Sequence, residues 1–545
     1  MLHFLNTLFP VRYTAMGLSA LGFLLSIFSW VAFDVGGSTF LLCAILLGIG
    51  VYDLCQTKRS VLRNYPIIGH MRFMLEFVRP EIRQYFIESD NEATPFSRAQ
   101  RSLVYQRAKG EPDKRPFGTQ LDVHGEGYEW MNHSVAPTKV ASHDFRITVG
   151  PNTKQPYSMS VFNISAMSFG ALSANAILAL NKGAKMGGFA HDTGEGSISI
   201  HHRVHGGDLI WEVASGYFGC RNDDGTFNAD KFAANACEPQ VKLIELKLSQ
   251  GAKPGHGGML PGAKVTPEIA AARGVPVGVD CISPAAHSAF STPIEMMQFI
   301  DRLRTLSGGK PTGMKLCIGH PWEWFAMVKA MLATGITPDF IVVDGAEGGT
   351  GAAPLEFTDH VGSPLQEGLL LVHTTLRGVG LRDKIQIGCA GKVVSAFDIA
   401  RLMALGADWC NSARGFMFAL GCLQAQTCHT GHCPTGVTTQ DPLRQQSLVV
   451  PDKAERVYNF HQQTMYALKE LIQAAGVIHP HQITAHHIVR RGTDHKVKSL
   501  AQLILTQLED GALLQDDLST LPLIYQHSWP RASAQSFAPI AQVGL

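Results

Sequence analysis

Eight short apolar runs, each followed by a stretch of helical character, constrain the fold of this chain more than any other feature. They begin at Val161, and most of them end in Gly, Ser, Lys, Asp or Glu. Parallel strands that are buried on both faces have this continuous apolar character, and the helices between them complete βα units. Eight such units predict an α/β protein with a (β/α)8 TIM barrel, whose chemistry lies at the carboxyl ends of the strands. The runs are residues 161–168, 187–193, 241–249, 275–283, 312–319, 340–347, 384–391 and 407–415.

A doubly wound parallel sheet is the alternative fold. The sequence has no G-x-G-x-x-G dinucleotide fingerprint, which disfavours that fold and a bound nicotinamide cofactor. The overall charge is nearly balanced, with 46 basic and 45 acidic residues, so nothing electrostatic favours nucleic acid as a partner.

The amino-terminal part differs in kind from the rest. Thr14–Phe33 is an uncharged run of bilayer length, residues 34–38 read as a turn, and residues 39–52 form a second apolar run. This pattern predicts a transmembrane hairpin, with a signal peptide or a buried amphipathic second segment as alternatives. Basic residues on both sides predict that both ends of the hairpin face the cytoplasm, and hence a catalytic domain on the cytoplasmic side of the inner (cytoplasmic) membrane. These residues are Arg12, Lys58, Arg59, Arg63, Arg72 and Arg79.

We therefore predict four segments along the chain. They are a transmembrane hairpin (1–57), an irregular, partly helical lead-in (58–150), the barrel (151–445) and a carboxyl-terminal helical extension (446–545) with a helix near 453–475. The histidines scattered through these segments have no carboxylate or cysteine partners at metal-site spacing, so we do not expect them to bind a metal.

Three cysteines lie close together at the end of the predicted barrel. Cys422, Cys428 and Cys433 are separated by five and then four residues, and Pro434 follows them. Thiolates this dense ligate iron–sulfur clusters or zinc, or form disulfides. Three ligands without a nearby fourth cysteine favour a three-iron cluster over a four-cysteine zinc site, and three ordinary loop thiols are the remaining alternative. Other cysteines lie in apolar runs and indicate a reducing compartment.

This cysteine spacing, with Ala-Leu-Gly before it and Pro-Thr-Gly-Val after it, resembles the 3Fe-4S motif of the glutamate synthase large subunit. The stretches 163–173, 191–196, 250–267 and 344–352 also resemble that family, and the likeness covers roughly residues 161–441. The resemblance implies a barrel that holds FMN and a 3Fe-4S cluster. In the family, reduced FMN delivers a hydride to 2-iminoglutarate, which is formed from 2-oxoglutarate and ammonia, and the cluster passes electrons to the flavin.

Residues at the strand ends provide the expected catalytic groups. We expect Lys315 to stabilise the negative charge of a reduced flavin, Lys253 to bind a substrate carboxylate and Gln250 to donate a hydrogen bond to a carbonyl. Glu347, in the last of the resembling stretches, is the fourth catalytic candidate. The expected cofactor-binding residues are Ser165, Ala166, Met167, Ser168, Gln250, Lys315, Asp344, Gly345, Gly348, Gly349, Gly391, Lys392, Ala413, Arg414 and Gly415, with Cys422, Cys428 and Cys433 as metal ligands. Of these, Arg414 and the glycine-rich turns at the last two strand ends would hold the FMN phosphate.

The chain departs from the family pattern at three positions near the substrate. Ile198 stands where a second carboxylate is expected, Tyr217 where an arginine is expected, and His256 where a glutamate is expected. If the arginine helps to bind a dicarboxylate, its loss would weaken 2-oxoglutarate binding. The sequence also leaves no room for the family's glutaminase domain, so ammonia would come from outside this chain.

The predicted function is therefore an FMN- and iron–sulfur-dependent amination of 2-oxoglutarate, or of a related keto or imino acid, to an amino acid. Electrons would come from a ferredoxin, a reductase subunit or a membrane partner. Two alternatives remain: another FMN barrel, such as a 2-hydroxyacid oxidase or an enzyme like inosine monophosphate dehydrogenase, and a membrane-anchored electron carrier with a decayed substrate site.

Overall fold

The computed structural model describes residues 11–91, 94–504 and 507–540. The chain divides into two compact units, Met1–Ala93 and Thr94–Leu545. Each unit is described by itself.

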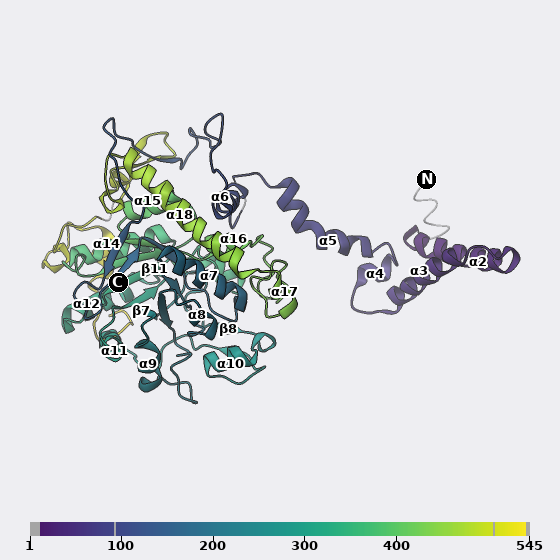
Figure 1. Cartoon of the computed structure of the whole chain (residues 1–545), viewed down its shortest axis with the longest axis horizontal. Helices are drawn as coiled ribbons and strands as arrows, with labels where there is room; N and C mark the ends of the chain where they lie inside the picture. The colour runs from purple at the N-terminus through teal and green to yellow at the C-terminus, as the bar shows by residue number, and fades with distance from the viewer. Residues whose placement is uncertain (1–10, 92–93, 505–506, 541–545) are drawn as a thin grey trace. The chain divides into compact units, whose positions relative to one another are not determined.

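The second unit is built around a closed barrel of eight strands in the order β10-β11-β12-β13-β4-β5-β6-β7 (Figure 1). All neighbouring pairs in the barrel are parallel, so all carboxyl ends meet at one rim, and the predicted (β/α)8 fold is confirmed. The strands are β4 (Phe162–Ile164), β5 (His191–Asp192), β6 (Leu209–Val213), β7 (Val241–Lys247), β10 (Thr312–Leu316), β11 (Phe340–Asp344), β12 (Gln386–Ala390) and β13 (Trp409–Ser412).

One predicted strand is wrong and one true strand was missed. Residues 275–283 do not enter the barrel, because they contain only β9 (Cys281–Ile282), which pairs antiparallel with β8 (Met259–Leu260) outside it. The valines there are largely exposed, Val277 at 56% and Val279 at 55%, so β-branched residues alone misled the prediction. The missing strand is β6, all of whose residues are buried, including a glutamate, Glu212, that interrupts its apolar pattern.

Helices follow the strands and cover the outside of the barrel. Ser173, Thr292 and Ser395 cap α7, α11 and α15 through side-chain bonds to backbone amides, which fixes where these helices begin. The barrel helices are α7 (Ala174–Gly187), α8 (Ile200–Arg203), α9 (Ala229–Ala236), α11 (Pro293–Leu306), α12 (Pro321–Thr334), α13 (Leu355–His360), α14 (Leu365–Gly378), α15 (Ala396–Ala404) and α16 (Arg414–Leu420). A further helix, α10 (Pro267–Arg273), lies between β8 and β9 in the excursion from the barrel.

The predicted carboxyl-terminal helix is present as α18 (Val450–Ala474). It runs across the barrel helices α7, α15 and α16 and also packs against α6 (Arg98–Lys109), which precedes the barrel (Figure 1). Its buried side chains, among them Val457, Phe460 and Leu468, recur at helical spacing. The segments before and after the barrel therefore share one core with it.

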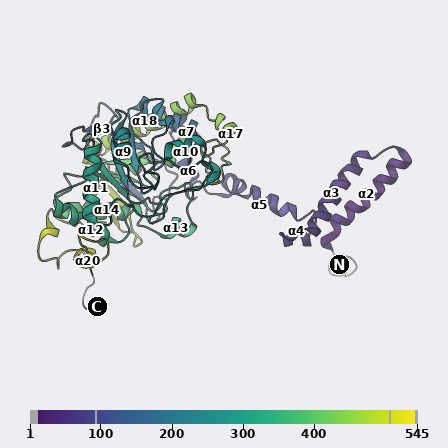
Figure 2. The ribbon, with the colours of Figure 1, turned by 90° about the horizontal axis from the view of Figure 1, so that it is seen from below.

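The first unit contains two long apolar helices, α2 (Thr14–Phe33) and α3 (Gly37–Cys55), which lie side by side (Figure 2). The turn between them uses left-handed backbone at Asp34 and Gly36. The ring of Phe40 on α3 packs against Phe23 and Trp30 of α2 at 5.0 and 5.5 Å between centroids. By length and composition both helices could cross a membrane. Two shorter helices follow, α4 (Ser60–Asn64) and α5 (His70–Ile82).

Candidate active site

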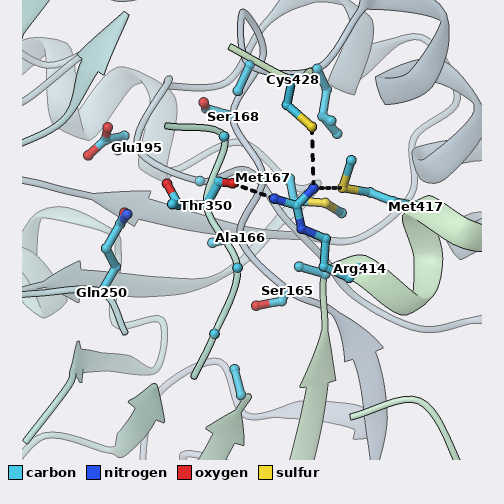
Figure 3. A pocket seen from close by; sticks show the side chains of 18 of the residues that line it. Ser165, Ala166, Met167, Ser168, Glu195, Gln250, Thr350, Arg414, Met417 and Cys428 are labelled. Atoms are coloured by element: carbon cyan, nitrogen blue, oxygen red, sulfur yellow. Dashed lines mark hydrogen bonds between the residues drawn. The ribbon is translucent and has the colours of Figure 1, made fainter. Parts of the chain in front are cut away.

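A cavity of about 190 Å³ opens at the carboxyl ends of the barrel strands (Figure 3). Residues after every one of the eight strands, or at their ends, contribute to its wall. From β4 to β7 the wall contains residues 165–168, 194–195, 212, 247, 250 and 253; from β10 to β13 it contains 315, 344, 348–352, 390–393 and 411–415. The topology thus brings segments that are far apart in the sequence, from Phe96 to Thr438, into one pocket.

Most of the predicted site residues line this cavity. Those that do are Ser165, Ala166, Met167, Ser168, Gln250, Lys253, Lys315, Asp344, Gly348, Gly349, Gly391, Lys392, Ala413, Arg414, Gly415 and Cys428. Gly345, Glu347, Cys422 and Cys433 are not among the lining residues. The Glu347 carboxylate instead accepts hydrogen bonds from the amide of Leu365, at 3.0 and 3.2 Å, and so caps the start of α14.

Charged side chains from neighbouring strands meet inside the barrel, and four of them line the cavity. Asp192, Glu212, Glu245, Lys247, Lys315 and Asp344 are called the buried charge cluster. Strand register explains the arrangement, because Glu212 pairs with Glu245 across β6 and β7, and Lys247 with Lys315 across β7 and β10. The Lys315 ammonium contacts the Glu212 carboxylate and lies 3.2 Å from Glu245 Oε1. Lys247 Nζ lies 3.5 Å from Glu212 Oε1.

Three carboxyl groups of this cluster, those of Asp192, Glu245 and Asp344, have raised pKa values. Burial, followed by the nearby charge of Asp192, raises the pKa of Glu245 well above its usual value. Burial also raises the pKa values of Asp192 and Asp344. Although Asp192, Glu212 and Glu245 place oxygen atoms within 4.8 Å of one another, the Lys315 ammonium already occupies the position of a cation there. In the cluster, carboxylates therefore balance the charges of the lysines, and the remaining carboxyl groups keep their protons.

Two further cations line the cavity; Lys253 and Arg273 are called the cationic mouth. Lys253 is only 7% exposed, yet its ammonium has no hydrogen bond or ion pair among the described residues. Arg273, the last residue of α10, is 3% exposed and donates to the carbonyl of Phe169 at 3.1 Å, without a carboxylate partner in the part of the chain that the structure describes. Burial lowers the pKa of Lys253.

Glu195 and Gln250 lie between the cluster and the mouth. Glu195 Oε2 is 2.9 Å from Lys247 Nζ, and Gln250 Oε1 accepts from the same ammonium at 2.7 Å. Burial raises the pKa of Glu195, but the charge and hydrogen bond of Lys247, with Arg273 and Lys253 nearby, bring it down to about 2. Glu195 is therefore ionised, and the Gln250 amide keeps its NH2 group for the cavity.

The structure shows an arginine at the cavity even though Tyr217 stands where the family has one. Tyr217 is fully buried, and its hydroxyl lies 3.0 Å from His287 Nδ1 and accepts from the amide of Ala289 at 3.2 Å, outside the cavity wall. Arg273 lines the cavity instead. Sequence reasoning missed it, together with the nearby Lys264, because both lie away from the strand ends; Lys247 was missed although it ends a predicted strand. A signal for Arg273 was available: Thr266 and Pro267, at the end of a recognised stretch, begin the short helix that carries it.

The last two strand ends form the wall where barrel proteins often bind phosphate. Lys392 has a φ of 53°, which is uncommon for a residue other than glycine and is typical of functional sites. Asn411 Oδ1 is buried in this wall and has no hydrogen-bond partner among the described residues. Arg414 contacts the carbonyl of Thr350, and its guanidinium lies 3.4 Å from Met417 Sδ and 3.9 Å from Cys428 Sγ (Figure 3).

The three clustered cysteines lie on the loop that follows α16. All three are free thiols; Cys422 and Cys433 are buried, and Cys428 reaches the cavity wall. Burial raises the pKa of Cys422 to about 11. Burial also raises the pKa of Cys433, but hydrogen bonds with Thr435 and Thr438 outweigh it and bring the pKa down to about 7. Neighbouring elements hold the loop, because Tyr105 Oη donates to the Cys422 carbonyl and Lys264 Nζ to the Cys428 carbonyl, at 2.6 and 2.8 Å.

The spacing of the thiols bears on what they could ligate. Within the described residues, only Asp192, Glu212 and Glu245 bring three Asp, Glu, His or Cys ligand atoms within 4.8 Å of one another. The Sγ atoms of the three cysteines therefore do not all lie within 4.8 Å of one another. A tetrahedral zinc site with bonds of about 2.3 Å needs ligand atoms roughly 3.8 Å apart, so the three thiols are too widely spaced for it.

The fold and this pocket define a (β/α)8 barrel protein with a charged site at the carboxyl ends of its strands and a three-cysteine loop beside it. Residues 135–478 match the family described as the conserved region in glutamate synthase, and the chain belongs to that family. The glutamate synthase large subunit-like protein YerD of Bacillus subtilis is 36% identical over 521 residues, which cover 88% of this chain and 98% of YerD.

Two further relatives share a smaller part of their length. The archaeal glutamate synthase (NADPH) of Methanocaldococcus jannaschii is 35% identical over 64% of this chain and 65% of its own. The archaeal-type glutamate synthase (NADPH) of Thermotoga neapolitana is 36% identical over 57% of this chain and 59% of its own.

Among solved structures, a flavocytochrome b2 variant with pyruvate bound matches 76% of this chain and 90% of its own, with 11% identity and a TM-score of 0.39. A mandelate oxidase variant matches 68% and 88%, with 14% identity and a TM-score of 0.38. The barrel assignment rests on the strand order and register rather than on these likenesses.

Proposed function

We propose that this protein is an FMN- and iron–sulfur-dependent oxidoreductase of the glutamate synthase type, acting on CH–NH2 groups. It would convert 2-oxoglutarate, or a closely related keto acid, to the amino acid with external ammonia and electrons from a partner. The observation that carries this proposal is the composition of one cavity: all eight strand ends, Cys428, and Lys253 and Arg273, which have no ion-pair partner among the described residues, line the same space. The family membership and the names of the relatives support it.

The wall residues fit a flavin mononucleotide. Residues 165–168 are small or flexible and leave room for a flat ring, and Asn411 Oδ1 offers an unused acceptor to an N–H donor. Gly391, Lys392 and Arg414 would hold the phosphate, and Lys315 would favour negative charge on the reduced ring. FMN, when bound, supplies hydride transfer to the substrate. The residues of this chain bind and orient it, and they set the charge of its surroundings.

The cationic mouth fits a substrate with carboxylates. Lys253 and Arg273 offer two positive charges to the two carboxylates of a dicarboxylic keto acid, and Arg273 can supply the arginine whose absence at Tyr217 was expected to weaken such binding. Gln250, held by Lys247, would donate its NH2 group to the keto or imino position. The ionised Glu195 lies close enough to Lys247 to hold that lysine's charge in place.

The three cysteines fit a 3Fe-4S cluster better than zinc. They are free, they are spaced too widely for one tetrahedral ion, and Cys433 has a pKa that favours the thiolate. A cluster held by Cys422, Cys428 and Cys433 would supply one-electron transfer. Because Cys428 also lines the cavity, its position is suited to carry electrons toward a flavin there. A ferredoxin or a reductase subunit would be the donor.

We also propose that α2 and α3 anchor the enzyme in the inner (cytoplasmic) membrane, with the barrel in the cytoplasm. The two helices have the length and composition of membrane spans, and basic residues follow them in sequence. The anchor would keep the enzyme near a membrane-associated electron source.

The decisive experiment compares the detergent-purified, anaerobic wild-type protein with Cys428→Ser and with the control Cys237→Ser, which changes an exposed cysteine. The wild type should show flavin bands over a broad iron–sulfur absorption that dithionite bleaches. Cys428→Ser should keep the flavin but lose most of its iron, because a ligand is removed, and Cys237→Ser should keep both. The assay is glutamate formation from 2-oxoglutarate, isotopically labelled ammonium and reduced ferredoxin.

Other outcomes would redirect the proposal. Flavin without iron in the wild type would favour a simpler FMN barrel of the 2-hydroxyacid oxidase kind. Both cofactors without conversion of any keto acid would favour an electron carrier. A folded protein that binds neither cofactor would refute the enzymatic function.

A further inference from the structure

The helix α5 follows the two apolar helices and carries a continuous apolar surface. Met71, Met74, Leu75, Val78 and Ile82 recur at spacings of three and four residues and form one side of it, here called the α5 apolar face. Four of them are exposed, between 40% and 58%, and no side chain of α5 is buried. A surface of this kind usually contacts another apolar phase.

A polar stripe lies along another side of the helix. Arg72, Glu76, Arg79 and Arg83, which is the residue directly after α5, lie at i, i+4, i+7 and i+11, and Arg72 bonds to Glu76 at 3.0 Å. Arginine side chains at such positions can extend their aliphatic stems along an apolar surface and keep the guanidinium in a polar layer. The helix therefore has the composition of one that lies in the plane of a membrane surface.

A buried aspartate fixes the start of α5 to the end of α3. Asp53 lies in the last turn of α3 and is fully buried. Its carboxylate accepts from the amide of Ile67 at 2.9 Å and bonds to His70 Nε2 at 2.9 and 3.0 Å. Because His70 is the first residue of α5, the helix begins at the level where the second apolar helix ends.

Charge in the same segment points to an anionic surface. Residues 58–83 contain six lysines and arginines and two glutamates. Basic residues next to a membrane span are attracted to anionic headgroups, and the attraction adds to the burial of apolar side chains.

We propose that α5 lies in the boundary between headgroups and acyl chains of the membrane that α2 and α3 span, where it binds anionic lipid. The inference rests on the proposed membrane anchoring. The α5 apolar face would enter the acyl boundary, and Arg72, Arg79 and Arg83 would contact lipid phosphates. A protein partner would also cover an apolar face, but the bond network of Asp53 places α5 next to the bilayer whatever else binds there.

The test uses the full chain reconstituted in phosphatidylcholine vesicles with and without phosphatidylglycerol. A photoreactive benzophenone replaces one side chain at a time: Met74→p-benzoylphenylalanine on the apolar face, Glu76→p-benzoylphenylalanine on the polar stripe, and Leu25→p-benzoylphenylalanine on α2, where the side chain is 59% exposed. All three positions are exposed, so the changes should leave the fold intact. Irradiation followed by mass spectrometry identifies what each position has captured.

The Met74 position should capture lipid several-fold more than the Glu76 position, and phosphatidylglycerol should increase the yield. If Leu25 captures lipid but Met74 does not, or if Met74 captures protein, the inference about α5 is wrong while the anchoring stands. If neither Leu25 nor Met74 captures lipid, both proposals fail. If only Met74 captures lipid, α5 binds the membrane surface without a spanning hairpin.

Discussion

The buried charge cluster and the cationic mouth lie in the same pocket but satisfy their charges in opposite ways. In the cluster, the Lys315 ammonium contacts the carboxylate of Glu212 and lies 3.2 Å from the carboxyl group of Glu245. In the mouth, Lys253 is nearly as buried but meets no carboxylate or hydrogen-bond acceptor among the described residues.

The difference distinguishes charges that stabilise the fold from charges that are available to bind a substrate. A buried charge is costly unless a partner offsets its desolvation, and the cluster supplies that partner from neighbouring strands. Lys253 has no such partner within the described ranges, so the desolvation of its ammonium group lowers its pKa. This desolvation stays without compensation until an anion binds. We therefore expect changes in the cluster to act mainly on stability and changes in the mouth to act mainly on substrate binding.

The largest effect is expected from Glu212→Ala. This change leaves Lys315 and Lys247 buried with one carboxylate fewer, and breaking a buried ion pair in this way costs roughly 3–5 kcal/mol. The variant should unfold at a clearly lower temperature and lose bound flavin, which thermal unfolding and absorbance of the purified protein would show.

A surface ion pair provides the matched control for Glu212. Asp301 is 53% exposed and pairs with Arg304, so Asp301→Ala should cost at most about 1 kcal/mol. Equal losses in the two variants would mean that the cluster stabilises the barrel no more than a surface pair does.

The second effect concerns the mouth. Lys253→Met removes a positive charge that has no partner in the described structure, so the unfolding temperature should stay the same or rise. Loss of one charge-assisted bond to a substrate carboxylate, about 1.5–3 kcal/mol, should lower kcat/KM by roughly 10- to 100-fold, mainly through KM. Steady-state kinetics with the keto acid and unfolding curves on the same preparation would separate the two predictions, and a destabilised variant with unchanged KM would reverse the comparison.

The barrel strands could be predicted from sequence where apolar residues dominate, even where a strand carries a charge of the cluster, as Glu245 does in β7 and Asp344 in β11. β6 was missed, and the burial of its Glu212 depends on Lys315, more than a hundred residues away. The exposed valines at 277 and 279 misled in the opposite direction, because propensity carries no information about burial.

The candidate site could be predicted only where residues follow strands directly. Lys253, Gln250 and Lys315 were found in this way. Arg273 lies on a helix of an excursion from the barrel, and only tertiary packing brings its guanidinium to the cavity wall. Glu347 was selected for its sequence context, yet a local bond to the amide of Leu365 turns its carboxylate away from the cavity.

The third effect is a change in the pH dependence of stability. The pKa of Glu245 is raised by burial and by Asp192, so the folded protein keeps a proton that the unfolded chain releases above its ordinary value of 4.5. Stability from this group is complete below that value and falls as pH rises toward the folded pKa, by up to about 1.4 kcal/mol per pH unit.

Glu245→Gln keeps the shape of the side chain and removes this titration, so its unfolding temperature should fall less than that of the wild type between roughly pH 5 and pH 8. Glu195→Gln is the matched control: the pKa of Glu195 is lowered to about 2, so its contribution is lost only on acidification below that range. If Glu245→Gln and the wild type had parallel pH profiles, Glu245 would be ionised beside Lys315, and the cluster would hold its charges by ion pairing alone, without a shared proton.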